Sequence, residues 1–205
     1  MRGFFITFEG IDGCGKSTQI DLLTKHFTKQ KKPVVKTEEP GGTAGSNEIR
    51  KILLRENNFQ WSVETEALLF MAARIDHVEK VIKPSIKDNK IVICDRFMDS
   101  TLVYQGMRSP KAKQLSLTLF ELIEINPDIT FLIDMEPEIA LNRALSRATE
   151  EDRFEKYGIN FQHQLRKNFL DIAYKHRDRI KIINGNQSPE DVAAQINESI
   201  KTLAL

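Results

Sequence analysis

The segment that most constrains the fold of this chain is Gly10–Ser17, whose sequence is GIDGCGKS. It matches the pattern G-x-x-x-x-G-K-S/T, follows the apolar run Phe4–Phe8 and precedes a helical pattern that begins at Lys16. Glycines let the backbone turn tightly and point its N–H groups at an anion, and the helix N-terminus adds partial positive charge. A glycine-rich turn with a chance lysine is the alternative, but it leaves the agreement of strand, spacing and helix unexplained. We therefore interpret the segment as a phosphate-binding loop, or P-loop.

The P-loop and the end of a neighbouring strand together predict a site for the phosphates of a nucleotide and for Mg²⁺. Lys16 is expected to reach the β- and γ-phosphates, and the Ser17 hydroxyl to ligate Mg²⁺. Asp95 follows the apolar run 91–94, where a carboxylate can hold Mg²⁺ or its water, and Arg96 can clamp a second anion. The alternative for these two residues is an exposed ion pair. The nucleotide phosphates are expected to contact the loop and the residue after it, namely Gly10, Ile11, Asp12, Gly13, Cys14, Gly15, Lys16, Ser17 and Thr18.

Short apolar runs alternate with helical patterns along the chain, which predicts an α/β fold with a parallel sheet and right-handed crossovers. Helices are expected over Lys16–Gln30 and Ser62–Pro84, and from Pro137 and Pro189 onward, because apolar residues there recur at helical spacing. Most of the apolar runs lack alternation, as strands covered on both faces do. Five strands are predicted, at Phe4–Phe8, Val34–Val35, Ile91–Cys94, Ile129–Ile133 and Ile180–Ile183.

Composition and charge narrow the class of protein. The 205 residues contain no linker-like stretch, so a single domain over residues 1–205 is expected. A net charge of +1 argues against binding nucleic acid through a strongly basic field. No apolar run is long enough to span a membrane, and the short run 4–6 soon meets Glu9, which is typical of a strand rather than of a signal peptide. Two cysteines are too few for a secreted disulfide scaffold, so a cytoplasmic location is expected.

Further motifs follow the P-loop in a characteristic order. They are Glu39-Pro40-Gly41-Gly42-Thr43, residues 49–53 (IRKIL), residues 69–74 (LFMAAR), Asp95-Arg96-Phe97, residues 100–106 (STLVYQG) and the arginine-rich segment 143–153. With these motifs the chain resembles bacterial thymidylate kinases over nearly its whole length. The resemblance implies a three-layer α/β/α fold of the P-loop NTPase type with a five-stranded parallel sheet and a short lid. It also implies Mg²⁺-dependent transfer of the ATP γ-phosphoryl group to dTMP, giving dTDP, by a homodimer, and the helix predicted over 62–84 is a candidate for the interface.

The resemblance assigns the thymine end of the acceptor site to two residues one helical turn apart. It implies that Phe70 stacks on thymine, with packing in the hydrophobic core as the alternative. Arg74 is expected to reach a thymine carbonyl, because it shares a helix face with Phe70. The alternative for Arg74 is an exposed side chain paired with Asp76 or Glu79.

The remaining acceptor contacts also come from the resemblance. Arg50 and Arg96 are expected to clamp the dTMP phosphate, since planar guanidinium groups suit two-point contacts, although Arg50 is also compatible with a solvated helix position. Asp12 is expected to face the acceptor sugar or its phosphate through metal, with a loop-capping role as the alternative. Tyr104 is expected to crowd the 2′ position. The other implied acceptor residues are Glu39, Ser100, Thr101 and Gln105.

The resemblance places a lid over ATP at residues 147–157, with Arg143 as an ATP contact. In this family the catalytic arginine comes either from the P-loop or from the lid. None of the variable P-loop positions 11–14 is basic, so Arg147 and Arg153 are predicted to be catalytic together with Lys16. The alternative is a solvated helix face with ion pairs to the neighbouring acidic residues 150–152.

Three features depart from the family pattern or stand apart from it. Glu38 occupies the place where many bacterial members have arginine before Glu-Pro-Gly-Gly, so one cation near the acceptor is replaced by an anion. The loop at residues 107–110 is shorter than is typical. Cys14 lies in the predicted anion cradle, where a helix N-terminus and Lys16 favour the thiolate, although an inert small residue is the alternative.

Overall fold

The computed structural model describes residues 3–54, 60–146, 154–201 and 203. Its centre is a five-stranded sheet in the order β2-β3-β1-β4-β5, with every neighbouring pair parallel. The prediction of a parallel five-stranded α/β fold is confirmed. The strands are β1 (Phe4–Glu9), β2 (Val34–Glu38), β3 (Ile91–Asp95), β4 (Ile129–Asp134) and β5 (Ile180–Asn184).

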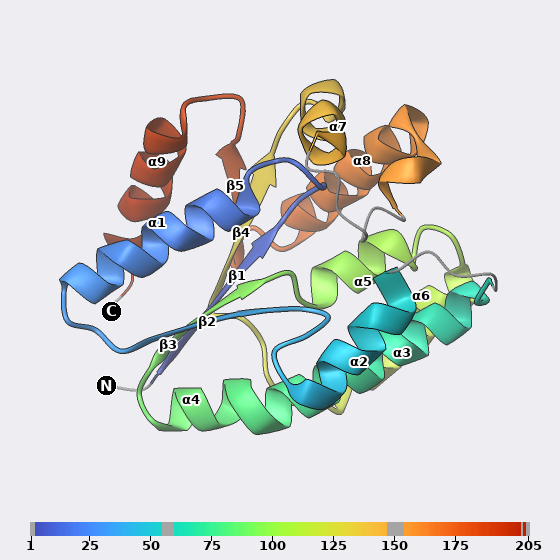
Figure 1. Ribbon diagram of the computed structural model, residues 1–205, viewed down its shortest axis with the longest axis horizontal. Helices are drawn as coiled ribbons and strands as arrows, with labels where there is room; N and C mark the ends of the chain where they lie inside the picture. Colours follow the sequence, from blue (N-terminus) through green and yellow to red (C-terminus); the bar gives the residue numbers. More distant parts are fainter. Residues whose placement is uncertain (1–2, 55–59, 147–153, 202, 204–205) are drawn as a thin grey trace.

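Helices cover both faces of the sheet and give three layers (Figure 1). The helices α1 and α9 lie together on one side, and α3, α4, α5 and α8 lie on the other (Figure 1). The helices predicted from Pro137 and Pro189 are confirmed as α7 and α9. The helical elements are α1 (Lys16–Lys29), α2 (Ala44–Leu54), α3 (Val63–His77), η1 (Val78–Ile82), α4 (Lys83–Lys87), α5 (Met98–Tyr104), α6 (Pro110–Glu121), α7 (Pro137–Leu145), η2 (Glu155–Tyr157), α8 (Ile159–Lys175) and α9 (Pro189–Lys201).

The long helix after residue 62 begins where predicted but ends later. Ser62 caps it, because its Oγ accepts a hydrogen bond from the Thr65 N–H at 3.1 Å. The prediction that the helix ends near Pro84 is wrong, since α3 continues through the π-helical turn η1 into α4, which ends at Lys87. Pro84 is tolerated because it lies in the first turn of α4, where its missing N–H removes no α-helical hydrogen bond.

Alternate residues of β1 and β3 pack into two different hydrophobic clusters. Ile6 and Phe8 belong to the larger cluster, which includes buried residues of α1, α8 and α9, whereas Phe5 packs with Val92 and Cys94 beneath α3 and α4. The edge strand β2 extends beyond the predicted Val34–Val35 to Glu38. The prediction stopped too early because the second half of the strand is polar and partly exposed, and hydrophobicity alone does not mark the end of such a strand. Of the helices in the described ranges, none is long and apolar enough to cross a membrane.

The sheet register brings acidic strand ends to one edge. Phe8 of β1 and Glu38 of β2 both pair with Asp95, the last residue of β3. Glu9, the last residue of β1, lies one position beyond this level. Ligands of open parallel sheets bind at this carboxyl edge, so the fold places the P-loop and the 95–105 segment together.

Candidate active site

The P-loop joins β1 to α1 in a conformation that requires glycine. Gly10, Gly13 and Gly15 have φ values of 136°, 82° and 102°, which L-residues rarely adopt. A Cβ atom at Gly13 would lie 1.9 Å from the carbonyl oxygen of Ala140 in α7. The loop therefore packs directly on the α7 backbone, and no other residue fits at position 13.

Lys16 lies inside this loop rather than in solvent. Its side chain is almost fully buried, and Nζ donates to the carbonyl oxygens of Gly10 at 3.0 Å and Ile11 at 3.1 Å. The Asp12 Oδ1 atom is 4.0 Å from Nζ. The ammonium group is therefore held at the mouth of the anion cradle, as the motif predicts.

Ser17 and Asp95 form a pair whose chemistry suits a hard cation. The Ser17 hydroxyl donates to Asp95 Oδ2 at 3.4 Å. The other carboxylate oxygen, Oδ1, is buried and has no hydrogen-bond partner among the described residues. An unpartnered buried oxygen beside a hydroxyl is a donor set that Mg²⁺ prefers, so these residues fit the predicted metal.

The thiol of Cys14 fits the alternative of an inert buried residue better than that of a favoured thiolate. Cys14 is buried, and burial raises the pKa of its thiol more than Lys16 and Arg96 lower it. The expectation of a favoured thiolate is therefore wrong, because loss of solvation outweighs the nearby cations.

Besides the phosphate cradle of the P-loop, the structure has a second pocket next to it. This pocket has a volume of about 650 Å³, part of which is open to solvent. Every residue that the sequence assigned to the acceptor lines it: Asp12, Glu39, Arg50, Phe70, Arg74, Arg96, Ser100, Thr101, Tyr104 and Gln105. The wall also includes residues that the sequence analysis missed: Pro40, Leu54, Phe97 and Phe154. Pro40 and Phe97 lie in motifs that the sequence analysis named and Phe154 lies in the predicted lid, but none was given a contact with the acceptor; only Leu54 had no signal in the sequence.

At the P-loop end of the pocket, Asp12 is held by two acceptor-site residues. Arg96 Nη2 donates to Asp12 Oδ1 at 2.5 Å, and the Tyr104 hydroxyl donates to Oδ2 at 2.9 Å. Burial alone raises the pKa of Asp12, but the charges of Arg96 and Lys16 and these hydrogen bonds lower it to about 2. Asp12 is therefore ionised and links the P-loop to the acceptor pocket.

The backbone at Arg96 is strained, and this conformation determines where the guanidinium group points. Its φ is 66°, in the left-handed region that residues other than glycine rarely adopt. The Arg96 N–H donates to the Phe8 carbonyl at 2.9 Å, and Nη1 donates to Ser100 Oγ at 3.0 Å. These contacts hold the guanidinium at the junction of the two sites.

Glu9 supports this region and was not predicted from the sequence. It is almost fully buried, its Oε1 accepts from the Phe97 N–H at 2.8 Å and the Ser100 N–H at 3.2 Å, and Oε2 accepts from Ser100 Oγ at 2.6 Å. Burial, followed by the charge of Asp99, raises the pKa of Glu9 to about 7. Its place next to the P-loop was the only signal in the sequence, because the partners are about ninety residues away.

At the opposite end of the pocket, Arg74 is buried and fixed on three sides. Nε donates to Glu39 Oε2 at 2.6 Å, Nη1 to Thr101 Oγ1 at 3.1 Å and Nη2 to the Phe97 carbonyl at 2.9 Å. Its side chain is 3% exposed, which excludes the alternative of a solvent-exposed ion pair. The proposed partners of that alternative bind lysines instead, Asp76 with Lys80 and Glu79 with Lys83.

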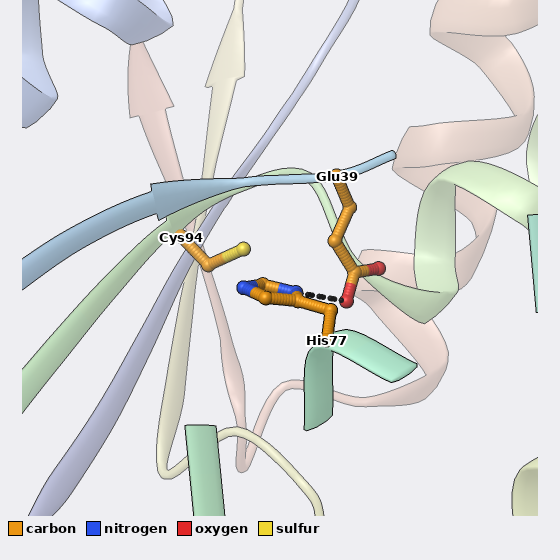
Figure 2. A group of neighbouring side chains, drawn as sticks. All are labelled: Glu39, His77 and Cys94. Carbon is orange, nitrogen blue, oxygen red and sulfur yellow. Dashed lines mark hydrogen bonds and ion pairs between the residues drawn. The ribbon is translucent and has the colours of Figure 1, made fainter. Parts of the chain in front are cut away.

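Glu39 lines the pocket, but its carboxylate is used within the protein. While Oε2 binds Arg74, Oε1 is 2.9 Å from Nδ1 of His77, and the two side chains point toward one another in Figure 2. Nε2 of His77 is in turn 2.7 Å from Thr37 Oγ1. A Cβ atom at Gly42 would lie 2.4 Å from the His77 ring, so glycine is required there as well. Glu39 therefore positions Arg74.

Cys94 completes a buried trio with Glu39 and His77 whose possible ligand atoms all lie within 4.8 Å of one another (Figure 2). Each of these groups already has a hydrogen-bond partner, and for Cys94 it is the Arg96 carbonyl, 3.1 Å from Sγ. Burial raises the pKa of the Cys94 thiol well above its usual value. With a protonated thiol and Arg74 paired to Glu39, the trio is better explained as a structural network than as a metal centre.

Arg50 reaches the open side of the pocket from α2. Its Nη1 donates to the Pro40 carbonyl at 2.8 Å and is 3.3 Å from Glu38 Oε2. The residue that departs from the family pattern therefore contacts the predicted phosphate clamp. Phe70, on α3, is half-buried and lines the same pocket while packing against the main hydrophobic cluster.

The predicted lid is only partly within the described residues. Arg147 and Arg153 lie outside them, so their catalytic role stays a prediction. Phe154 follows and is buried, with its ring centroid 5.1 Å from that of Tyr104. Arg143 lies on the exposed side of α7, and its Nη1 is 3.5 Å from the sulfur of Met135, so its contact with ATP also stays a prediction.

The geometry defines a class of protein: a P-loop kinase with a separate pocket for a phosphorylated acceptor. The family profile described as thymidylate kinase matches residues 8–196. The thymidylate kinase of Ruegeria pomeroyi is 47% identical over 201 residues, which cover 98% of this chain and 95% of that protein. That of Dinoroseobacter shibae is 48% identical over 195 residues, covering 95% and 94%. This chain belongs to the thymidylate kinase family.

A solved structure agrees with this assignment. The crystal structure of thymidylate kinase from Ehrlichia chaffeensis superposes with a TM-score of 0.79 at 33% sequence identity, covering 98% of this chain and 100% of that one. The three-layer P-loop fold predicted from the sequence is therefore that of the family.

Proposed function

We propose that this protein transfers the γ-phosphoryl group of ATP to the 5′-phosphate of dTMP, giving dTDP. The observation that carries the proposal is the second pocket, which is lined by an aromatic ring, the buried Arg74 and two further arginines, of which Arg96 contacts Asp12 of the P-loop. A protein that only binds or hydrolyses ATP has no use for such an acceptor site. The family membership supports the same reaction.

On the donor side, the P-loop would bind the phosphates of ATP through its inward-facing N–H groups and the N-terminus of α1. The buried Lys16 ammonium would pair with the β- and γ-phosphates. Ser17 and Asp95 would hold Mg²⁺, which supplies positive charge that offsets the charge developing on the phosphates. Oδ1 of Asp95 is available for this purpose, because it has no hydrogen-bond partner among the described residues.

On the acceptor side, Phe70 would stack on the thymine ring, and Arg74 would donate to a thymine carbonyl. Arg74 carries this role because Glu39 and the Phe97 carbonyl already fix the plane of its guanidinium. Arg96 and Arg50 would bind the dTMP phosphate, with Arg96 nearest the P-loop through Asp12. Tyr104, held against Asp12, would crowd the 2′ position of the sugar.

Three further parts of the proposal rest on the family and on less direct features. Arg147 and Arg153 would supply the cations that stabilise the transferring phosphoryl group. A homodimer through α3 is supported by exposed apolar residues on that helix, Leu68 at 47% and Ile75 at 42% exposure. A cytoplasmic location is supported by the two free cysteines, Cys14 and Cys94.

The proposal is tested by following ADP release with one acceptor at a time, using dTMP, dUMP, dCMP, dGMP and dAMP. A clear preference for dTMP is expected, because the chain belongs to the thymidylate kinase family. Equal slow ADP release with every acceptor, and the same rate with none, would contradict the proposal and indicate an ATP-hydrolysing regulatory protein instead.

A further inference from the structure

Gln105 is held from behind by a buried carboxylate that neither the sequence nor the family assignment gave a role. Gln105 lines the acceptor pocket at the end of α5, and its side chain is almost fully buried. Its Nε2 donates to Oε2 of Glu66 at 3.3 Å. Glu66 lies on α3 and is fully buried. The Nε2 atom of Gln105 is thus hydrogen-bonded to a residue that does not line the pocket.

The charge of Glu66 is compensated by a second contact. Arg108 Nη1 donates to the same Oε2 atom at 2.6 Å, and its own side chain is 24% exposed. A buried carboxylate needs such a counter-charge, since an isolated one would be strongly destabilising. Glu66 therefore acts as a fixed hydrogen-bond acceptor toward Gln105.

An acceptor-only neighbour fixes which way the amide of Gln105 points. An ionised carboxylate cannot donate, so turning the amide over would place Gln105 Oε1 against Glu66 Oε2 in a buried position. These two oxygen atoms would then face each other with no hydrogen atom between them, and both would lose their hydrogen bonds to water without any replacement. The orientation with Nε2 toward Glu66 leaves Oε1 of Gln105 to face the pocket.

Arg74 lines the same pocket, so this orientation gives the pocket a donor and an acceptor. Arg74 can only donate, and its Nη1 is 3.1 Å from Thr101, which lies in the same helix turn as Gln105. A donor next to an acceptor matches the edge of thymine or uracil, where a carbonyl adjoins a ring N–H. Cytosine presents an amino group and a bare ring nitrogen in the same places, so both contacts would be mismatched.

We propose that Glu66 is a specificity-determining positioning residue, which holds the Gln105 amide so that the pocket selects thymine or uracil over cytosine. The inference rests on the proposed function, because it concerns the acceptor of that reaction. Glu66 is not among the residues that line the pocket, and it acts through its hydrogen bond with Gln105.

The test is the Glu66→Gln variant, assayed with dTMP and dCMP on the same preparation. A glutamine at this position can accept from Arg108 and donate to Gln105, so the Gln105 amide is free to turn over. The ratio of kcat/KM for dTMP to that for dCMP is expected to fall about tenfold, the effect of one mismatched hydrogen bond in a buried site. Because both substrates see the same enzyme, the ratio is independent of the folded fraction.

Two further variants complete the experiment. Glu64→Gln is the matched control, since Glu64 lies on the same helix but accepts from the Ser109 hydroxyl instead, and it should leave the ratio unchanged. If Glu66→Gln does not fold, the double variant Glu66→Gln with Arg108→Gln removes charge and counter-charge together and gives the same comparison.

The outcomes separate the inference from the proposed function. A Glu66→Gln enzyme that is weaker on dTMP but keeps the wild-type ratio would overturn the positioning role and leave Glu66 a structural residue. A wild-type enzyme that fails to phosphorylate dTMP would instead contradict the proposed function itself.

Discussion

Glu38 limits the affinity of the acceptor pocket for a phosphate, and its replacement is expected to lower the KM for dTMP. The carboxylate lies 3.3 Å from Arg50 Nη1, and its side chain is 57% exposed. In this position it occupies part of the guanidinium that would bind the dTMP phosphate, and it repels the phosphate itself. Removing the charge should therefore strengthen acceptor binding without touching the P-loop.

The size of the effect follows from the exposure of the pair. Exposed ion pairs contribute about 0.2–1 kcal/mol, which corresponds to a change of roughly 1.4- to 5-fold in binding. Glu38→Gln should lower the KM for dTMP by such a factor. Glu38→Arg should lower it further, because a cation then replaces the anion. The effect should shrink as salt is raised, since exposed charges are screened.

The assay is steady-state kinetics at low and high salt with dTMP and ATP varied in turn. The KM for ATP should change less than the KM for dTMP in both variants, since Glu38 pairs with Arg50 of the acceptor pocket. Glu48→Gln is the matched control, because Glu48 is an exposed acidic residue of α2 that pairs with Lys51. An unchanged or increased KM for dTMP at low salt in Glu38→Gln would refute the reasoning.

Three other predictions test separate parts of the site. Lys16→Ala should abolish phosphoryl transfer while calorimetry still detects dTMP binding, and loss of that binding would contradict the placement of Lys16 in the donor site. Phe70→Ala should raise the KM for dTMP by roughly 5- to 150-fold, from about 1–3 kcal/mol of base stacking, and leave the KM for ATP nearly unchanged. Glu9→Gln should change how stability depends on pH, because the pKa of Glu9 is raised from 4.5 to about 7 in the folded protein. The contribution of its carboxyl to stability is full below pH 4.5 and is lost as pH rises through 7, by about 3 kcal/mol at most. Urea unfolding from pH 5 to 8 should therefore show the wild type losing stability relative to Glu9→Gln, and a constant difference would disprove the shifted titration.

The central strands of the fold could be predicted because they are buried on both faces. Ile91–Cys94 is a continuous apolar run and Ile129–Ile133 is apolar except for Thr130, and the structure extends each by one acidic residue. The edge strand β2 could not be bounded in this way, because its outer residues face solvent. The helix past residue 84 was misjudged because a proline in the sequence gives no sign of the π-helical turn that precedes it.

The candidate site was predictable where a motif carries its own geometry. The P-loop needs only the local strand, turn and helix, and its lysine and glycines are placed as the motif requires. The acceptor residues came from a family resemblance, and the pocket brings all of them together. Hydrophobicity and spacing alone would not have separated Phe70 from its core neighbours.

Contacts between distant segments set the limit of the sequence analysis. Glu66 lies in the first turn of α3, where an acidic residue is already explained by the helix dipole, and its partner Gln105 is thirty-nine residues away. The burial that raises the pKa of the Cys14 thiol likewise depends on how the loop packs, which a single segment does not reveal. The charge of a buried side chain depends on the residues that pack around it in the folded protein, and not on its residue type alone.

We propose that the P-loop and the second pocket hold the donor and the acceptor of one phosphoryl transfer. The most direct measurement is to follow a γ-labelled ATP phosphate in the presence of dTMP and identify the labelled product. We expect the label to appear in dTDP, in an amount equal to the ADP formed. Label that appears as inorganic phosphate, at a rate independent of dTMP, would contradict the proposal.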